Sequence, residues 1–276
     1  MVPVLLPVVA ILLASSCGGR SGSQGQPLMS VPDNAGGLLV SEEYKTEIPL
    51  ILDAPDPETN TVISHMGYTV SYNSRHRIPN WVAYELLDSE LYGDFSRGGK
   101  FGPDPAFKGR QAYDRDYSGS GWDRGHMAPS GDMKWSSQTM KECFYLTNIC
   151  PQDHNLNSGD WNDLEKLVRK ECRYYKRVWI ACGPVIGRAV HGSIGENMVT
   201  VPDGFFKALL ARRKDGTYTA IGFYFENKPG HRPLSEYAMS IDDLEKLAGM
   251  DFFYILPAEV QDEVERCYNL RDWRVR

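Results

Sequence analysis

The stretch Gly121–Asp132, with the sequence GWDRGHMAPSGD, places an aspartate, an arginine and a histidine within four consecutive positions. Ionisable side chains are costly to remove from water, so such a cluster needs a compensating role in structure or function. An imidazole with its ordinary pKa of about 6.5 can accept a proton from water near neutral pH. A histidine taken alone is more often a hydrogen-bonded structural residue. The interpretation of His126 therefore depends on which other residues share its site.

A second polar stretch, HNLNSGDWNDLEKL, begins at His154 and contains Asn157 and Glu165. Asn157 is a natural N-cap for a helix that starts there. Glu165 lies eight positions further on, two turns and a fraction, and therefore leans toward the same side of that helix. Taken singly, Glu165 is explained as a solvated carboxylate and His154 as a loop histidine. Only the combination of these residues points to chemistry.

The ordered set DRGH at 123–126, NICPQ at 148–152 and LNSGDWNDLE at 156–165 is similar to the DNA/RNA non-specific endonuclease family. In that family, the sugar-non-specific branch of the ββα-metal nucleases, the first two motifs end strands and the third lies on a metal-binding helix. Every fixed position of the family pattern is present in this chain. The resemblance extends from about residue 65 to about residue 256.

The resemblance implies a catalytic role for three residues. His126 would be the general base that deprotonates the attacking water. Asn157 would be the one direct protein ligand of a divalent cation, and Glu165 would assist catalysis by holding a metal-bound water. We expect Mg²⁺, with Mn²⁺ as the alternative, because a hard ion accepts an amide oxygen and phosphate oxygens as ligands.

A cationic side chain must also face the negative charge that develops on the phosphate. The family uses an arginine shortly before a Phe-x-x-Asp-Pro segment, which is SRGGKFGPDP in this chain. Arg97 is the nearest arginine, and its planar group can hold two phosphate oxygens at once. Lys100 lies closer to Phe101, so the spacing leaves both residues open.

The neighbours of these residues are expected to support the site. Asp123 and Arg124 would fix the loop and the ring of His126, and Arg124 is alternatively available to touch nucleic acid. Gly125 would let the backbone turn close to the phosphate. Asn148 would tie the second strand end to the site.

The expected function is metal-dependent endonucleolytic hydrolysis of DNA and RNA that leaves 5′-phosphate ends. Sequence preference should be small, because phosphates carry no sequence information. The alternatives are a catalytically inactive nucleic-acid-binding lipoprotein of the same fold and a phosphodiesterase for another polyanion. The presence of His126, Asn157 and Glu165 together argues against loss of catalysis.

Composition excludes some other classes of function. The chain has 30 basic and 36 acidic residues and a net charge of −6, which argues against simple electrostatic capture of nucleic acid.

Five cysteines follow Cys17, at positions 143, 150, 172, 182 and 267, without a C-x-x-C pair that would indicate zinc. If residues 143–150 form one strand, its ends are roughly 23 Å apart and Cys143 cannot bridge Cys150. The sequence leaves the oligomeric state open.

The first 17 residues are expected to be a signal peptide. Val2–Ala14 is an uncharged apolar run, and the following SSCGG resembles a bacterial lipobox in which Cys17 carries the lipid. This predicts an exported protein, a periplasmic or cell-surface lipoprotein held to a membrane through Cys17. A secreted protein with a plain signal peptide is the alternative. Residues 18–44, with a Gly-, Ser-, Pro- and Gln-rich start, are expected to form a flexible linker.

Residues 45–276 are expected to form one nuclease domain with a full core, since 42% of the chain is hydrophobic and 24% is charged. Hydrophobic patterns predict strands at 81–86, 144–149, 177–185, 205–213 and 217–225. Helices are predicted from 157 to about 176, over 240–249, and from 258 to about 268. Because no βαβα rhythm appears, we expect an α+β fold. Its mixed, largely antiparallel central sheet would be flanked by helices and carry a ββα-metal finger.

Overall fold

The computed structural model describes residues 45–52, 56, 58–96, 98–187 and 190–275 of the chain. The predicted signal peptide at 1–17 with its lipobox at Cys17, the predicted linker at 18–44, and Arg97 lie outside the described residues. Among the described helices, none combines the length and the apolar character that crossing a membrane requires.

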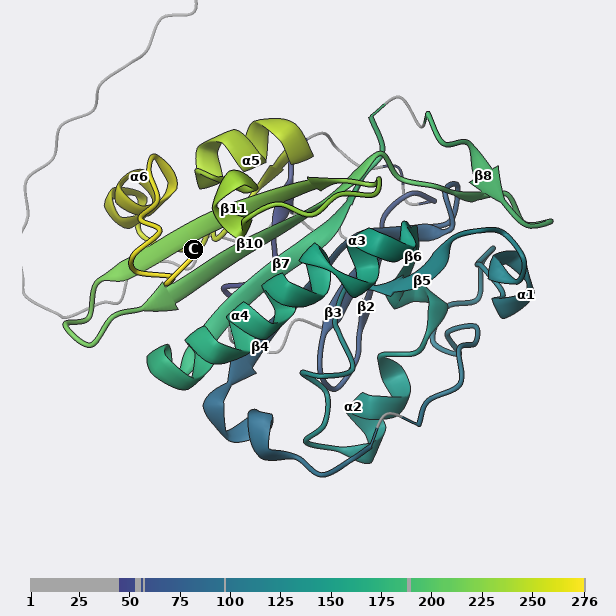
Figure 1. Ribbon diagram of the computed structural model, residues 1–276, viewed down its shortest axis with the longest axis horizontal. Coiled ribbons are helices and arrows are strands. Elements are labelled where there is room, and N and C mark those ends of the chain that lie inside the picture. Colours follow the sequence, from purple (N-terminus) through teal and green to yellow (C-terminus); the bar gives the residue numbers. More distant parts are fainter. Residues whose placement is uncertain (1–44, 53–55, 57, 97, 188–189, 276) are drawn as a thin grey trace, which may run out of the picture. The chain divides into compact units, whose positions relative to one another are not determined.

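A seven-stranded sheet organises the described part of the chain (Figure 1). Its strands run in the order β12–β11–β10–β7–β4–β3–β2, and each neighbouring pair is antiparallel. They are β2 (Thr61–Ser64), β3 (Thr69–Asn73), β4 (Ile78–Leu87), β7 (Arg177–Val185), β10 (Gly204–Arg212), β11 (Tyr218–Glu226) and β12 (Ala238–Met239). The predicted α+β class with a largely antiparallel sheet is confirmed.

Three two-stranded sheets accompany the large one. They pair β1 (Leu50–Ile51) with β13 (Met250–Asp251), β5 (Asp123–His126) with β6 (Ile149–Gln152), and β8 (Ser193–Ile194) with β9 (Val199–Thr200). The helices are α1 (Asp114–Tyr117), α2 (Ser137–Glu142), α3 (His154–Ser158), α4 (Asp160–Tyr175), α5 (Ile241–Ala248) and α6 (Ala258–Glu265). Short 3₁₀ turns are η1 (Asp88–Tyr92), η2 (Leu146–Asn148) and η3 (Leu234–Glu236).

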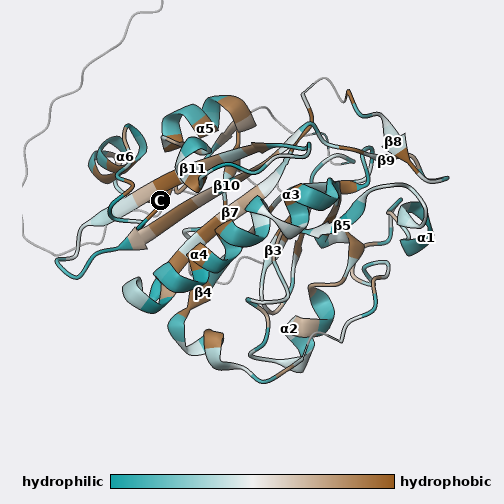
Figure 2. Ribbon diagram, in the orientation of Figure 1, coloured by the Kyte–Doolittle hydropathy of each residue, from teal (hydrophilic) through white to brown (hydrophobic). Residues whose placement is uncertain are grey.

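The large sheet has an apolar core on each face. In β10, Phe205 and Leu209 belong to one core, whereas Phe206 and Leu210 belong to the other, as the alternation of side chains along a strand requires. Helix α4 packs on β7 and β4 on the first face, and α5 and α6 pack on β11 on the second (Figure 1). Figure 2 shows apolar residues along the central strands and a mixture of apolar and polar residues on α4.

Most predicted elements are found within one or two residues of their expected ends. Four of the five predicted strands correspond to β4, β7, β10 and β11, although β4 begins three residues earlier than predicted. Helix α5 has the predicted N-cap, because Ser240 Oγ accepts from the Asp243 amide at 3.1 Å, and it ends at Gly249 with φ of 67°. Helix α6 ends at Glu265, three residues before the predicted end.

The strand predicted at 144–149 is wrong. Residues 146–148 form the 3₁₀ turn η2, and the strand begins only at Ile149. The Asn148 carboxamide holds this compact conformation: its Nδ2 donates to the carbonyls of Ala128 at 2.9 Å and Cys143 at 2.8 Å. A short apolar run cannot by itself distinguish a strand from another buried segment, so the side-chain bonds decide.

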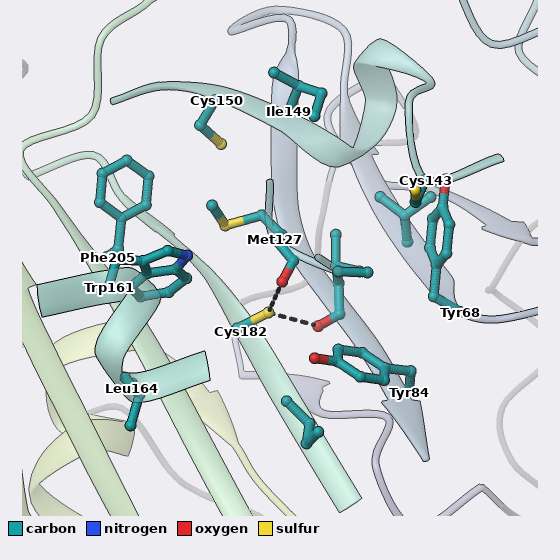
Figure 3. Packing of buried hydrophobic residues seen from close by; sticks show 14 of the residues in the cluster. Tyr68, Tyr84, Met127, Cys143, Ile149, Cys150, Trp161, Leu164, Cys182 and Phe205 are labelled. Carbon is teal, nitrogen blue, oxygen red and sulfur yellow. Dashed lines mark hydrogen bonds between the residues drawn. The ribbon is translucent and has the colours of Figure 1, made fainter. Parts of the chain in front are cut away.

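The core also fixes the chain just after the DRGH motif. Met127 is fully buried, and its carbonyl accepts a hydrogen bond from Cys182 Sγ on β7 at 3.3 Å (Figure 3). The cysteines at 150, 172, 182 and 267 are free thiols, Cys143 is buried with the first three of them, and only Cys267 is exposed. His126 is therefore attached to the rigid face of the large sheet through its immediate neighbour.

Candidate active site

The DRGH and NICPQ motifs form the two strands of a ββα arrangement. Strands β5 and β6 are antiparallel, with Asp123 opposite Gln152 and His126 opposite Ile149. Asn148 closes the open end of this pair, because its backbone oxygen accepts from the Met127 amide at 3.0 Å and its side-chain oxygen accepts from the Ala128 amide at 2.8 Å. Helices α3 and α4 follow β6 directly.

His126 is almost enclosed, with 7% of its surface exposed. Its ring lies between two aromatic rings, 5.4 Å from that of Phe101 and 5.0 Å from that of Phe144, the latter in an edge-to-face contact. The indole Nε1 of Trp161, on α4, donates to the His126 carbonyl at 3.2 Å. The helix and the strand are thus joined at the histidine, and its ring has little freedom to turn.

Asn157 is not the helix N-cap that the sequence predicts. The N-cap is Asp153, whose side chain accepts from the amides of Asn155 at 2.9 Å and Leu156 at 3.1 Å. Asn157 lies in the last turn of the short helix α3, and Gly159 separates α3 from α4 with φ of −100° and ψ of −111°. A Cβ at Gly159 would lie 2.4 Å from the Asn155 carbonyl oxygen, so a glycine is needed for this break. Capping therefore does not account for Asn157.

Asp123 orients the side chain of Asn157. Its Oδ2 accepts from Asn157 Nδ2 at 2.9 Å and lies 2.9 Å from Nδ1 of the exposed His154, the first residue of α3. Because an ionised carboxylate can only accept, the amide nitrogen must face Asp123, which leaves the amide oxygen as the atom able to bind a cation. We expected Asp123 to hold the loop and the ring of His126; its hydrogen bonds place it instead beside the predicted metal ligand.

One cavity of about 390 Å³ brings the predicted residues together. Its lining includes Arg124, His126, Ser130, Asn157, Asn162, Glu165 and Arg169. Asn157 and Glu165 reach it from two successive helices, not from one helix as the sequence predicts, because the chain breaks at Gly159. A histidine, an amide oxygen, a carboxylate and two guanidinium groups therefore surround a space that can hold a phosphate and a hydrated cation.

Arg124 is anchored by its own neighbours. Its Nε donates to Asp114 Oδ1 at 2.6 Å and its Nη2 to the Asp114 carbonyl at 2.9 Å. The guanidinium also lies 5.5 Å from the ring centres of Phe101 and Tyr117. Arg124 is thus held at the cavity wall, beside the aromatic ring that packs on His126.

A glycine is needed at position 125 for a reason that differs from the expected one. Gly125 lies within β5, and a Cβ there would lie 2.2 Å from Oε1 of Gln152 on the paired strand β6. The glycine is therefore required by the close approach of the Gln152 side chain, which is fully buried. A sharp turn of the backbone toward a phosphate is not what this position provides.

Sequence reasoning missed Arg169, which lines the same cavity. Its Nη1 donates to Asp132 Oδ1 at 2.7 Å and lies 4.0 Å from Glu165 Oε2. Burial lowers the pKa of Arg169, but Asp132 and Glu165 more than offset this and raise it above its ordinary value. The available signal was its position one helical turn after Glu165, the i, i+4 spacing that places two side chains on one face.

The predicted transition-state cation is not located by the described residues, since Arg97 lies outside them. Its competitor Lys100 is exposed, and within the described part of the chain it is not among the residues that line the cavity. The cationic groups found at the cavity are Arg124 and Arg169.

Two paired strands followed by two short-linked helices, with a histidine on the first strand and an asparagine on the first helix, define a ββα site of the nuclease type. The chain belongs to the DNA/RNA non-specific endonuclease family, whose model matches residues 51–259. The predicted family is therefore confirmed, and the family and the names of the relatives support a nuclease hydrolase.

Named relatives agree with this assignment. The human protein "Nuclease EXOG, mitochondrial" is 40% identical over 249 residues, which cover 84% of this chain and 65% of the relative. The human "Endonuclease G, mitochondrial" is 33% identical over 202 residues, 68% of each chain. A crystal structure of the EndoG/EndoGI complex matches with a TM-score of 0.67 and 28% identity, covering 75% of this chain and 91% of that one. The chain thus spans slightly less than two thirds of human EXOG.

The predicted location is wrong. The relatives from human, mouse and cattle are named as mitochondrial nucleases, which contradicts an exported lipoprotein of the periplasm or cell surface and a secreted protein alike. An apolar run followed by small residues has a composition shared by several kinds of targeting segment, so composition does not identify the membrane to which the chain is directed.

Proposed function

We propose that residues 45–276 form a divalent-metal-dependent endonuclease domain that hydrolyses the phosphodiester bonds of DNA and RNA with little sequence preference. The observation that carries the proposal is the common cavity of His126, Asn157 and Glu165, three residues brought together from separate elements. Family membership supports the same reaction and substrates. The cavity presents groups suited to phosphate and metal chemistry, which are common to every nucleotide.

His126 would act as the general base. Its ring is clamped between Phe101 and Phe144, and its backbone is tied to Trp161, so the imidazole is held in one orientation at the cavity. A fixed orientation favours proton transfer from a water molecule placed against the scissile phosphorus. The departing 3′ oxygen would leave a 5′-phosphate on the other product.

The donor set at the cavity fits a hard divalent cation. Asn157 would bind it through the amide oxygen that the hydrogen bond to Asp123 leaves available, and Glu165 would hold a water molecule of its hydration shell. Mg²⁺ keeps several of its waters and needs few protein ligands when phosphate oxygens complete its shell, so we propose Mg²⁺ with Mn²⁺ as a substitute. When bound, the cation would supply positive charge beside the phosphate and the departing oxygen.

Arginines would complete the site. Arg124 and Arg169 line the cavity, and each is held by a carboxylate, Asp114 and Asp132 respectively. We propose Arg97 as the further cation that faces the developing charge, with Lys100 as its competitor.

The test uses the full-length chain with closed circular DNA and with RNA, in Mg²⁺ and in chelator. Circular DNA has no ends, so any cleavage of it is endonucleolytic. We expect Mg²⁺-dependent cleavage of both substrates, and a loss of about 10² to 10⁴ in rate for His126→Ala. His76→Ala is the matched control, because this half-buried histidine bonds to Thr200 and does not line the cavity in the described structure.

The outcomes separate the possible functions. A folded parent that binds but cleaves neither substrate in Mg²⁺, Mn²⁺ or Ca²⁺ would replace the proposal with a nucleic-acid-binding protein. Equal rates for the parent and His126→Ala would remove His126 as the base.

A further inference from the structure

Three carboxylates meet on the face of the sheet opposite α4. Asp242 and Glu245 lie three positions apart on α5 and therefore share one side of that helix, while Glu265 is the last residue of α6. One oxygen from each of the three lies within 4.8 Å of those of the other two. Because α5 and α6 pack against each other and on β11, this arrangement is built by the tertiary fold (Figure 1).

Glu265 distinguishes this trio from an ordinary acidic surface. It is only 8% exposed, and its Oε1 is buried without a hydrogen-bond partner among the described residues. Glu245, by contrast, has one partner, because its Oε1 accepts from the Phe252 amide at 2.8 Å. A buried carboxylate oxygen without a donor is costly, so the arrangement calls for a positive group at Glu265.

The charges around Glu265 increase the need for a positive group. Burial raises the pKa of Glu265 to about 8, and the four charged groups with the largest effect on it are all carboxylates: Glu245, Asp251, Asp242 and Asp262. Burial likewise raises the pKa of Glu245 to about 7, and Lys246 opposes this only weakly, after the effects of two aspartates. The Lys246 ammonium bonds instead to Asp243, at 3.0 Å.

We propose that Asp242, Glu245 and Glu265 form a Ca²⁺ site that is separate from the catalytic cavity and joins α5 to α6. Two oxygens on opposite sides of one Ca²⁺ ion are separated by about 4.8 Å, twice a Ca²⁺–oxygen distance of about 2.4 Å, and the three oxygens meet this limit. Several protein carboxylates around one ion favour Ca²⁺, whereas Mg²⁺ usually keeps its water and takes one or two protein ligands.

The site has a structural consequence. A cation there would attach α6 to α5 through charge, where the apolar contact of α6 with the core is made by few residues, Val264 among them. The nuclease would then contain two cation sites of different chemistry on opposite faces of its sheet. The catalytic site would use a neutral amide ligand, and the second site would use three carboxylates.

Ca²⁺ titration of the metal-free, full-length Asn157→Ala variant tests this site without the proposed catalytic ligand. Calorimetry should show one Ca²⁺ ion bound per chain, and a Ca²⁺ concentration of about a hundred times Kd should raise the Tm by about 5 to 10 °C. Adding Glu265→Gln should abolish both effects. Glu263→Gln, the same change at an exposed position of α6, should abolish neither.

A second variant tests whether a loss of Ca²⁺ binding is caused by misfolding. Asp242→Asn changes a partly exposed position of α5, and in the Asn157→Ala background it should lower Ca²⁺ affinity at least tenfold while the circular dichroism spectrum stays unchanged. Absence of Ca²⁺ binding in Asn157→Ala, or binding that survives both Glu265→Gln and Asp242→Asn, would overturn the proposal. Nuclease activity does not enter these readouts, so they are independent of the proposed function.

Discussion

Two groups of carboxylates lie on opposite faces of the same sheet, and the two groups have opposite kinds of partner. Behind the candidate cavity, the buried Asp132 accepts from Arg169 at 2.7 Å and from Tyr84 Oη at 2.8 Å. Between α5 and α6, Glu265 is almost as buried, but its neighbours in the trio are two further carboxylates. The comparison shows that burial alone does not indicate how a carboxylate contributes to stability; its partners decide the sign.

The partners also differ in origin. The groups that donate to Asp132 lie on one face of α4 and on the strand below it. Their hydrogen bonds therefore form whenever α4 packs on the sheet. Among the described side chains, the trio between α5 and α6 lacks a positive partner for Glu265, which is why we propose a bound cation there. Four predictions test this contrast.

The largest effect is expected for Arg169→Met. This change would leave buried carboxylates without a cation, as in the trio between α5 and α6. Asp132, 1% exposed, would keep Tyr84 but lose its cation, and Glu165 would become its like-charged neighbour. The free energy of unfolding should fall by about 3 to 5 kcal/mol, measured by chemical denaturation. Lys166→Met, an exposed cation on the same helix, should change it by no more than about 0.5 kcal/mol. Equal stability of the two variants would contradict the role of Arg169.

A smaller effect is expected for Asp123→Ala, because Asp123 orients the proposed metal ligand and does not bind the metal itself. Losing its bond to Asn157 Nδ2 should raise the Mg²⁺ concentration for half-maximal cleavage about 10- to 100-fold, with activity recovered at high Mg²⁺. Asp163→Ala, on α4 but outside the residues that line the cavity, is the control. Activity that no Mg²⁺ concentration restores would show that Asp123 acts in another way.

Glu265→Gln should stabilise the protein in chelator at neutral pH. The substitution keeps the shape of the side chain and removes an ionisable group whose charged form is disfavoured by burial and by neighbouring carboxylates, so the free energy of unfolding should rise by about 1 to 3 kcal/mol. Denaturant titration of this variant beside Glu263→Gln measures the difference. A loss of stability would mean that the carboxylate already has a favourable partner in the fold.

The smallest effect is a pH dependence from Asp104, a buried carboxylate that does have partners. It accepts from Thr147 Oγ1 at 2.7 Å and the Ala106 amide at 2.9 Å, and lies 2.9 Å from His65 Nε2. Burial raises the pKa of Asp104, but His65 and these hydrogen bonds outweigh it and hold the pKa below its ordinary value.

For a carboxyl group with a lowered pKa in the folded state, the stabilisation is complete above the unfolded pKa of about 3.9 and disappears as the pH falls through the folded value. The free energy of unfolding should therefore decrease on acidification below about pH 4, by about 1 kcal/mol from this residue. Asp104→Asn should lack this part of the decrease in a series of denaturation curves. An unchanged pH profile in the variant would show that other groups cause it.

The sequence alone determined the features that depend on short stretches of chain. Short hydrophobic patterns located four central strands, and Ser240 and Gly249 marked both ends of α5, because such patterns and caps act within a few residues. The ordered motifs likewise identified the family and brought His126, Asn157 and Glu165 to attention, before any arrangement in space was known.

The tertiary structure decided how those residues are held and what they neighbour. Asp123 turned out to orient Asn157 from 34 positions away, and Arg169 to neutralise Asp132 from 37 positions away. Glu265 joins a carboxylate trio only because α6 packs on α5. Such contacts depend on which elements meet in space, and electrostatic energies fall with distance. Residue types and spacing therefore pointed to the chemistry, whereas the partner of each charge was set by the packing.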